Sequence, residues 1–182
     1  MTIGDRWGVT EEETARRYPC DDEVSAPELQ LWRGVTVHAA PGELWPWVAQ
    51  VRLAPYSYDW IDNLGRRSPR DLRGLPDPVA GEPFTRALGR PQGLILSVAV
   101  GEQLTGRLLG VVMSYVLVAQ PNATRLLLKL VSDRFRRAAP LLSLGDLVMA
   151  RQQLLNFKHL AESGRAPCRH RARSTGSVLL DG

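Results

Sequence analysis

The sequence predicts an α+β fold in which an antiparallel sheet curls over one long C-terminal helix. Three observations lead to this expectation. Between residues 82 and 131, short apolar segments alternate with turn residues, which is typical of an antiparallel meander. A strand pattern followed by a helical pattern precedes them, between residues 29 and 51. An apolar helical period then runs from Pro140 to about Leu160, which is roughly six turns of helix.

The composition fits one globular domain. The chain has 182 residues, of which 44% are hydrophobic and 23% charged, enough to bury a sizeable core. The net charge is +4, but most of it lies in residues 163–182, so the rest of the chain is nearly neutral. The charged residues of that segment are Arg165, Arg169, Arg171, Arg173 and Asp181. A basic domain for nucleic acid is therefore not expected.

No segment of the sequence has the pattern of a membrane anchor or a secretory leader. The N-terminus carries charges where a signal peptide needs a continuous apolar run. The longest uncharged apolar stretch, Leu108–Ala119, is shorter than the roughly 18 residues that span a bilayer. We therefore expect a soluble, cytoplasmic protein with no stable membrane insertion.

Residues 1–28 are expected to form an N-terminal arm. Thr10 and Glu13 have the spacing of a capping box, which predicts a short helix over Glu11–Arg17 that ends at Pro19. The following acidic stretch up to Glu28 has no apolar period. It is expected to be an extended connection.

A strand and a helix are expected next. Residues 29–39 alternate as a strand, with Val35 and Val37 on one face. Pro41 suits the first turn of a helix, and apolar residues follow at helical spacing: Leu44, Trp47, Val48 and Val51. Pro46 lacks a backbone donor, so we expect a bend or a late helix start there. A loop rich in Pro, Gly and Arg over residues 66–81 is a candidate lid or surface excursion.

Five strands are expected after this loop, over residues 82–88, 92–100, 102–109, 111–119 and 124–131. In the last strand Leu126, Leu128 and Leu130 alternate with Arg125, Leu127 and Lys129, so one face is expected to be dry and the other mostly wet. On the C-terminal helix the predicted buried stripe contains Leu141, Leu144, Val148 and Leu155, flanked by Leu147 and Leu154. Gly164 and Pro167 end that helix, and residues 163–182 are expected to be a flexible basic tail.

Four segments of the sequence resemble the START-like superfamily, also labelled SRPBCC or polyketide cyclase/dehydrase-like. They are VTVHAAPGELWPWVAQV, YSYDWIDN, SYVLV and GDLVMARQQLLNFKHLAE, and they look closest to an uncharacterised actinobacterial branch. The resemblance covers about residues 29–162, which divides the chain into an arm (1–28), a START-like domain (29–162) and a tail (163–182). It implies a helix grip, in which a curved antiparallel β-sheet wraps around a long C-terminal α-helix and leaves a cavity between them.

The segment YSYDWIDN, residues 56–63, is the main candidate for a binding wall. It offers phenols, carboxylates and an amide on an aromatic surface, the combination that a ligand pocket needs. Packing in the core is the alternative, and a helical turn here would leave at most one of Tyr56 and Tyr58 for a ligand. Trp45 and Trp47 are two positions apart, so on a helix they point to nearly opposite sides, about 160° apart, which suggests one in the core and one at a cavity rim.

The candidate ligand-binding residues are Trp47, Tyr56, Tyr58, Asp59, Trp60, Asn63, Phe84 and Tyr115. On the strand over residues 111–119, Ser114 and Tyr115 lie on opposite faces, and either could place a hydroxyl in the cavity.

No motif for a metal, a cofactor or a nucleophile is present. The three histidines, His38, His159 and His170, lack metal-ligand spacing, and there is no HExxH, GxSxG, P-loop or GxGxxG pattern. We therefore expect no metal, no cofactor and no catalytic triad. Cys20 and Cys168 form no CxxC pattern, and one bridge between them is left open.

Members of the superfamily bind lipids, sterols, polyketides or other apolar molecules, and a minority catalyse cyclisation or dehydration. The resemblance therefore implies that this protein binds a small hydrophobic or aromatic ligand between the sheet and the C-terminal helix. One alternative is a metal-free cyclase or dehydratase acting on a polyketide-like substrate, with Tyr56, Tyr58 or Asp59 as the acid–base group. A second alternative is an interaction module that uses the Arg-rich tail.

Overall fold

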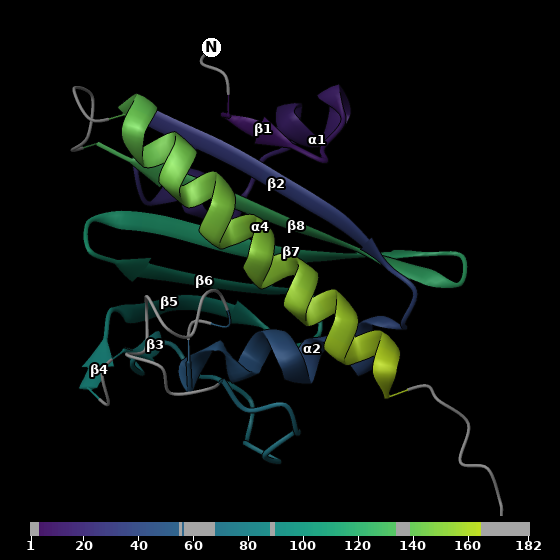
Figure 1. The fold of residues 1–182 in the computed structure, drawn as a ribbon. Helices are drawn as coiled ribbons and strands as arrows, with labels where there is room; N and C mark the ends of the chain where they lie inside the picture. Colours follow the sequence, from purple (N-terminus) through teal and green to yellow (C-terminus); the bar gives the residue numbers. More distant parts are fainter. Residues whose placement is uncertain (1–3, 55, 57–67, 88–89, 134–138, 165–182) are drawn as a thin grey trace, which may run out of the picture.

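The predicted architecture, a sheet curved around a C-terminal helix, is present in the structure (Figure 1). The computed structural model describes residues 4–54, 56, 68–87, 90–133 and 139–164, except for the side chains of residues 87 and 139–148. The C-terminal helix α4, Ala139–Ser163, lies across one face of the sheet. We call this the inner face, and the opposite one the outer face. No helix in the described part of the chain is long and apolar enough to cross a membrane.

The main sheet has six strands in the order β1-β2-β8-β7-β6-β5. The long strands are β2 (Leu29–Val37), β7 (Val111–Gln120) and β8 (Ala123–Ser132), and the shorter ones are β1 (Arg6–Trp7), β5 (Leu94–Ala99) and β6 (Gln103–Leu108). All neighbours are antiparallel except β1, which runs parallel to β2. The sheet is therefore mixed at one edge, which the strand pattern did not predict.

The segment predicted as the first strand of the meander lies outside this sheet. Within the described residues, strand β3, Thr85–Ala87, pairs with β4, Arg90–Gln92, alone and forms a separate two-stranded ladder. Gly93 follows with a φ of 69°, a conformation that few other residues adopt, and it separates β4 from β5. The chain thus changes direction before it enters the main sheet.

Helix α2, Pro41–Ala49, packs against the C-terminal half of α4 and continues into a 3₁₀ turn, η2, Gln50–Arg52. The late start expected from Pro46 is wrong, because the helix begins at Pro41. The Glu43 carboxylate accepts a hydrogen bond from the backbone N–H of Ala40 at 2.8 Å, which stabilises this early start. Pro46 therefore lies inside the helix.

The inner face of the sheet and α4 share one apolar core. From β8 it contains Leu126, Leu128 and Leu130, the residues predicted to form the dry face. In the described turns of α4 the buried stripe consists of Ala150, Gln153, Leu154, Phe157 and Ala161. Leu155 is only half-buried and its flanking residue Leu154 is fully buried, whereas the side chains of Leu141, Leu144 and Val148 lie outside the described residues.

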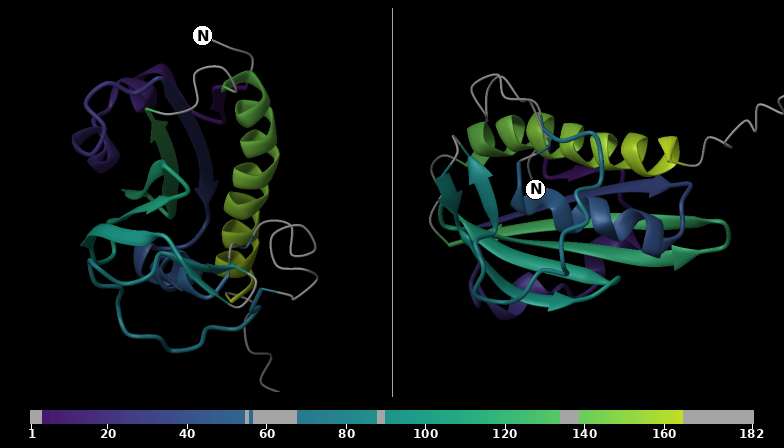
Figure 2. Two further views of the ribbon diagram at one scale, coloured as in Figure 1. Left: turned by 90° about the vertical axis from the view of Figure 1, so that its left-hand side faces the viewer. Right: turned by 90° about the horizontal axis from the view of Figure 1, so that it is seen from below.

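The outer face is also buried, which contradicts the expectation of a mostly wet face. Leu127 and Lys129 of β8 are 1% and 4% exposed. The N-terminal segment, residues 4–28, packs over them and places Tyr18 and Cys20 in a second apolar cluster (Figure 2). The strand pattern could not show this, because the covering residues lie about 110 positions away in the sequence.

The N-terminal segment contains α1, Glu11–Ala15, and a 3₁₀ turn, η1, Pro19–Asp22. The predicted capping box of α1 is present, but the helix is shorter than expected and part of the expected extended connection is helical. Gly8 has a φ of 66°, and a Cβ there would lie 2.3 Å from the carbonyl oxygen of Gly34. Glycine at position 8 thus lets the segment lie directly against β2.

Polar contacts hold this segment on the sheet. Glu13 forms a two-bond ion pair with Arg125 at 2.7 and 2.9 Å, and Asp21 pairs with Lys129 at 2.5 Å. The backbone N–H of Cys20 donates to Ser114 Oγ at 2.9 Å. Burial raises the pKa of the Cys20 thiol to about 11, so this free cysteine is a packing residue. Cys168, its only candidate partner for a bridge, lies outside the described residues.

The Glu13 ion pair predicts a pH dependence of stability. Its hydrogen bond from Arg125 holds the pKa of the Glu13 carboxyl below its ordinary value of 4.5. Because the folded-state pKa is lowered, the carboxylate stabilises the fold above pH 4.5. That contribution is lost as the pH falls below 4.5 and through the folded-state pKa. We expect Glu13→Gln to cost about 1 kcal/mol at pH 7.

Urea unfolding at a series of pH values tests this dependence. Below pH 4.5 the stability of the wild type should fall more steeply than that of Glu13→Gln. The exposed neighbour Glu12 provides the matched control, because Glu12→Gln should keep the wild-type slope. Equal slopes for the wild type and Glu13→Gln would contradict the prediction.

Candidate functional site

Four aromatic side chains meet between the sheet, α2 and α4. The rings of Tyr56 and Phe157 are 5.4 Å apart, those of Tyr115 and Phe157 are 6.4 Å apart, and those of Phe84 and Tyr115 stack at 6.4 Å. All four are at most 2% exposed. A Cβ at Gly106 of β6 would lie 2.0 Å from the Phe84 ring, so glycine at this position makes room for it. These rings form an aromatic wall on the inner face.

Tyr115 places its hydroxyl at the interface between sheet and helix. Its phenol donates a hydrogen bond to Gln153 Oε1 of α4 at 2.7 Å, and both residues are buried. Ser114 points to the outer face, where its Oγ lies 2.7 Å from Thr105 Oγ1. Of the two hydroxyls that the sequence left open, Tyr115 is therefore the inward one.

Tyr56 joins the aromatic wall to a set of side-chain amides. Gln50 Nε2 donates to the Tyr56 phenol oxygen, and Asn156 Nδ2 of α4 donates to the Tyr56 carbonyl at 2.8 Å. The φ of Tyr56 is 55°, which is strained for a bulky residue and is maintained only when surrounding contacts require it. Arg73 N donates to Gln50 Oε1 at 2.8 Å, so the loop before β3 also contributes to this arrangement.

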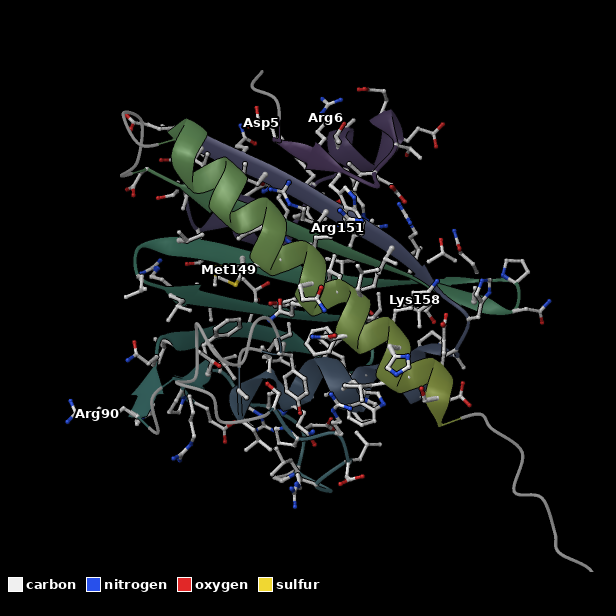
Figure 3. All side chains as sticks on the ribbon, in the orientation of Figure 1. Asp5, Arg6, Arg90, Met149, Arg151 and Lys158 are labelled. Atoms are coloured by element: carbon white, nitrogen blue, oxygen red, sulfur yellow. The ribbon has the colours of Figure 1, made fainter. Side chains whose placement is uncertain are left out.

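A pocket of about 250 Å³ opens beside Tyr56 at the C-terminal end of α4. Its lining combines polar and apolar groups: Tyr56, Ser68, Pro69, Arg70, Asn156, His159, Leu160 and Ser163. Nearby Lys158, labelled in Figure 3, donates from Nζ to the carbonyl of Thr36 at 2.7 Å and fixes this end of α4 to β2. Tyr56 thus belongs both to the pocket lining and to the aromatic wall.

The structure brings together three of the eight predicted site residues. Tyr56, Phe84 and Tyr115 belong to the aromatic wall, and Trp47 lies in the same core without a ring contact to them. Both tryptophans of α2 are buried, and Trp45 donates from its indole N–H to Asp77 at 2.8 Å. The other four candidates, Tyr58, Asp59, Trp60 and Asn63, lie outside the described residues.

Four further residues of the site were not among those predicted from the sequence. They are Gln50, Gln153, Asn156 and Phe157, which supply the amides and the central ring. Three of them follow one another at i, i+3 and i+4 on α4, the spacing of one helix face. Gln153 is the polar residue within the buried stripe of that helix, and its place among apolar residues is a signal that the sequence contains.

The polar groups of the wall and pocket suit ligand orientation. The phenols and amides pair with one another and with backbone groups, and such groups fix the position of a bound molecule. Among the residues that the structure describes, no three histidine, cysteine or carboxylate side chains cluster to hold a metal ion.

Neither a family model nor a curated protein matches the sequence. Among solved structures, protein NE0264 from Nitrosomonas europaea is 13% identical, with a TM-score of 0.50 over 76% of this chain and 97% of its own. Protein MLL2253 from Mesorhizobium loti is 16% identical, with a TM-score of 0.49 and coverages of 74% and 97%. An AHSA1-like protein from Aeromonas hydrophila is 14% identical, with a TM-score of 0.46 and coverages of 74% and 94%.

At these identities the likeness concerns the fold, and membership of an actinobacterial branch stays a prediction. The sheet order, the helix across the inner face and the likeness to NE0264 agree with one another. The chain has the helix-grip fold that the resemblance implied, a curved sheet wrapped around a long C-terminal helix.

Proposed function

We propose that the protein binds a small hydrophobic or aromatic molecule between the sheet and α4. The observation that carries this proposal is the aromatic wall beside a surface pocket. The Gln50 amide lies at one end of the wall and the Gln153 amide at the other. A large apolar surface with a few oriented polar groups is the usual composition of a ligand site. The ligand would enter this pocket, lie against Tyr56 at the edge of the aromatic wall and exchange hydrogen bonds with the Asn156 amide.

The first experiment is native mass spectrometry of the purified full chain, which should show a bound small molecule. The second uses 1-anilinonaphthalene-8-sulfonate as a fluorescent probe of the pocket. Leu160→Trp places a large ring in the pocket lining and should weaken probe binding at least about tenfold, since the occupied volume is lost. Leu94, which is 46% exposed on β5, gives the matched control Leu94→Trp.

Two further variants address the polar groups. Tyr115→Phe and Gln153→Leu each remove one partner of the inner hydrogen bond and should alter probe affinity by about three- to tenfold. Two results together would overturn the proposal. Mass spectrometry would show no bound molecule, and the Leu160→Trp and Leu94→Trp variants would bind the probe with the same affinity. The cyclase or dehydratase alternative stays a prediction, because Tyr58 and Asp59 lie outside the described residues, as does most of the Arg-rich tail.

A further inference from the structure

A second, larger groove lies at the end of the sheet where β6 begins. Its volume is about 730 Å³, within the range of ligand-binding clefts, and it shares no lining residue with the pocket beside Tyr56. Four parts of the chain form it: the N-terminal segment, the start of α2, the β5–β6 turn and the end of β7. The lining residues are Arg16, Arg17, Pro19, Pro41, Val100, Gly101, Glu102, Gln103, Val116, Leu117, Val118 and Ala119.

One wall of this groove is an open strand edge. The pairing of β6 with β7 ends at Gln103 and Val116, whereas β8 remains paired with β7 as far as Gln120. The β7–β8 hairpin therefore extends beyond β6, as Figures 1 and 2 show. The last residues of β7 have a partner strand on one side only in the described part of the chain.

The backbone groups on this edge can be assigned from the ladder. Leu117 N–H donates to the Glu102 carbonyl at 2.8 Å, so it points to the β6 side. In an antiparallel strand the groups of every second residue point the same way. The N–H and C=O of Ala119 therefore face the groove, where the described strands supply no partner. Ala119 is exposed.

The side walls of the groove differ in chemistry. Arg16 and Arg17 lie on the side of the N-terminal segment, and Pro41 lies at the start of α2. Arg17 pairs with Asp22, whereas Arg16 is exposed and makes no hydrogen bond or ion pair with another described residue. The β5–β6 turn closes one end with Glu102. A strand bound in the groove would thus have the Arg16 and Arg17 cations near one face and the apolar ring of Pro41 near the other.

We propose that this groove binds an extended acidic peptide of a partner protein, added as a strand along residues 117–120 of β7. Strand addition satisfies the free backbone groups, and alternate side chains give specificity. Acidic side chains on one face of the peptide would lie near Arg16 and Arg17, and apolar side chains on the other face near Pro41. The chain's own residues 165–182 have four arginines and one aspartate, which is the wrong charge for this site.

Fluorescence anisotropy with the full chain tests the proposal. The probe is a labelled short peptide that alternates glutamate and valine, and the control peptide alternates lysine and valine. The Glu–Val peptide should bind saturably, and the Lys–Val peptide at least about tenfold more weakly because of the two arginines. Replacing Arg16 and Arg17 together with glutamine should remove most of this preference.

The strand edge has its own matched pair of variants. Ala119→Pro removes the N–H that faces the groove and leaves the β7–β8 hydrogen bonds intact, so it should weaken binding about three- to tenfold. Ala119→Val keeps that N–H and should bind the peptide as the wild type does. Thermal unfolding of both variants should resemble that of the wild type, which shows that the hairpin is preserved.

Three results would overturn the proposal. One is the absence of saturable Glu–Val peptide binding to the wild type. Another is equal affinity of Ala119→Pro and Ala119→Val for that peptide. The third is dimerisation in sedimentation experiments that Ala119→Pro abolishes while the peptide does not compete, because the groove would then bind a second copy of the chain.

Discussion

Replacing Asp21 with alanine is expected to lower the free energy of unfolding by about 3 kcal/mol, because it leaves the buried Lys129 cation without its carboxylate. The Lys129 side chain is 6% exposed and that of Asp21 is 25% exposed, so water cannot replace the lost partner fully. Two rings also face the ammonium group, with Tyr18 at 5.5 Å and Trp32 at 5.0 Å. The cation is thus enclosed on the outer face of the sheet.

Urea unfolding followed by circular dichroism measures this loss. Asp22→Ala is the matched control, because its ion pair with Arg17 is exposed and should change stability by less than about 0.5 kcal/mol. Adding Lys129→Met to Asp21→Ala should restore most of the stability, since the unpaired charge is then removed. An equal effect of Asp21→Ala and Asp22→Ala would show that the Asp21–Lys129 pair does not anchor the N-terminal segment.

Phe157→Ala is expected to lower the free energy of unfolding by about 3–5 kcal/mol, the usual cost of removing a fully buried ring. Phe157 has no exposed surface and contacts both Tyr56 and Tyr115, so its loss opens a cavity at the centre of the aromatic wall. The more conservative Phe157→Leu should cost about 1–2 kcal/mol because most of the volume is kept.

Leu155→Ala is the control on the same helix, where Leu155 is half-buried. It distinguishes a specific role of the Phe157 ring from a general loss of packing on α4. It should cost clearly less than Phe157→Ala, as measured by denaturant midpoints at a constant m-value. If the two losses were the same, Phe157 would have no special position in the core.

Most of the fold could be predicted because local patterns determine it. The alternation of the two strand faces in residues 124–131, with leucines at every second position, predicted β8, and the capping pair Thr10 and Glu13 predicted α1. The apolar helical period likewise predicted α4, although the structure extends it to Ser163. Each of these signals lies within one element, so no knowledge of the tertiary structure was needed.

The buried outer face could not be predicted in this way. Lys129 has the polarity of a surface residue, and only a carboxylate 108 positions earlier explains its burial. Part of the candidate site could not be predicted from local patterns either. Tyr56, Phe84 and Tyr115 stood out as aromatics in the sequence, but Gln153 and Asn156 resemble solvent-facing residues of a helix until the fold places them beside the rings.

The N-terminal segment also affects the order in which the molecule can assemble. Two of its ion pairs join residues 108 and 112 positions apart, and the sheet partners in both belong to β8. During synthesis the segment emerges before the β7–β8 hairpin, yet its docking surface is complete only after that hairpin has formed. Contacts of such long range add to the contact order and slow folding. Residues that leave the ribosome well before the hairpin therefore reach their native positions after it, and the outer face of the hairpin stays uncovered until they do.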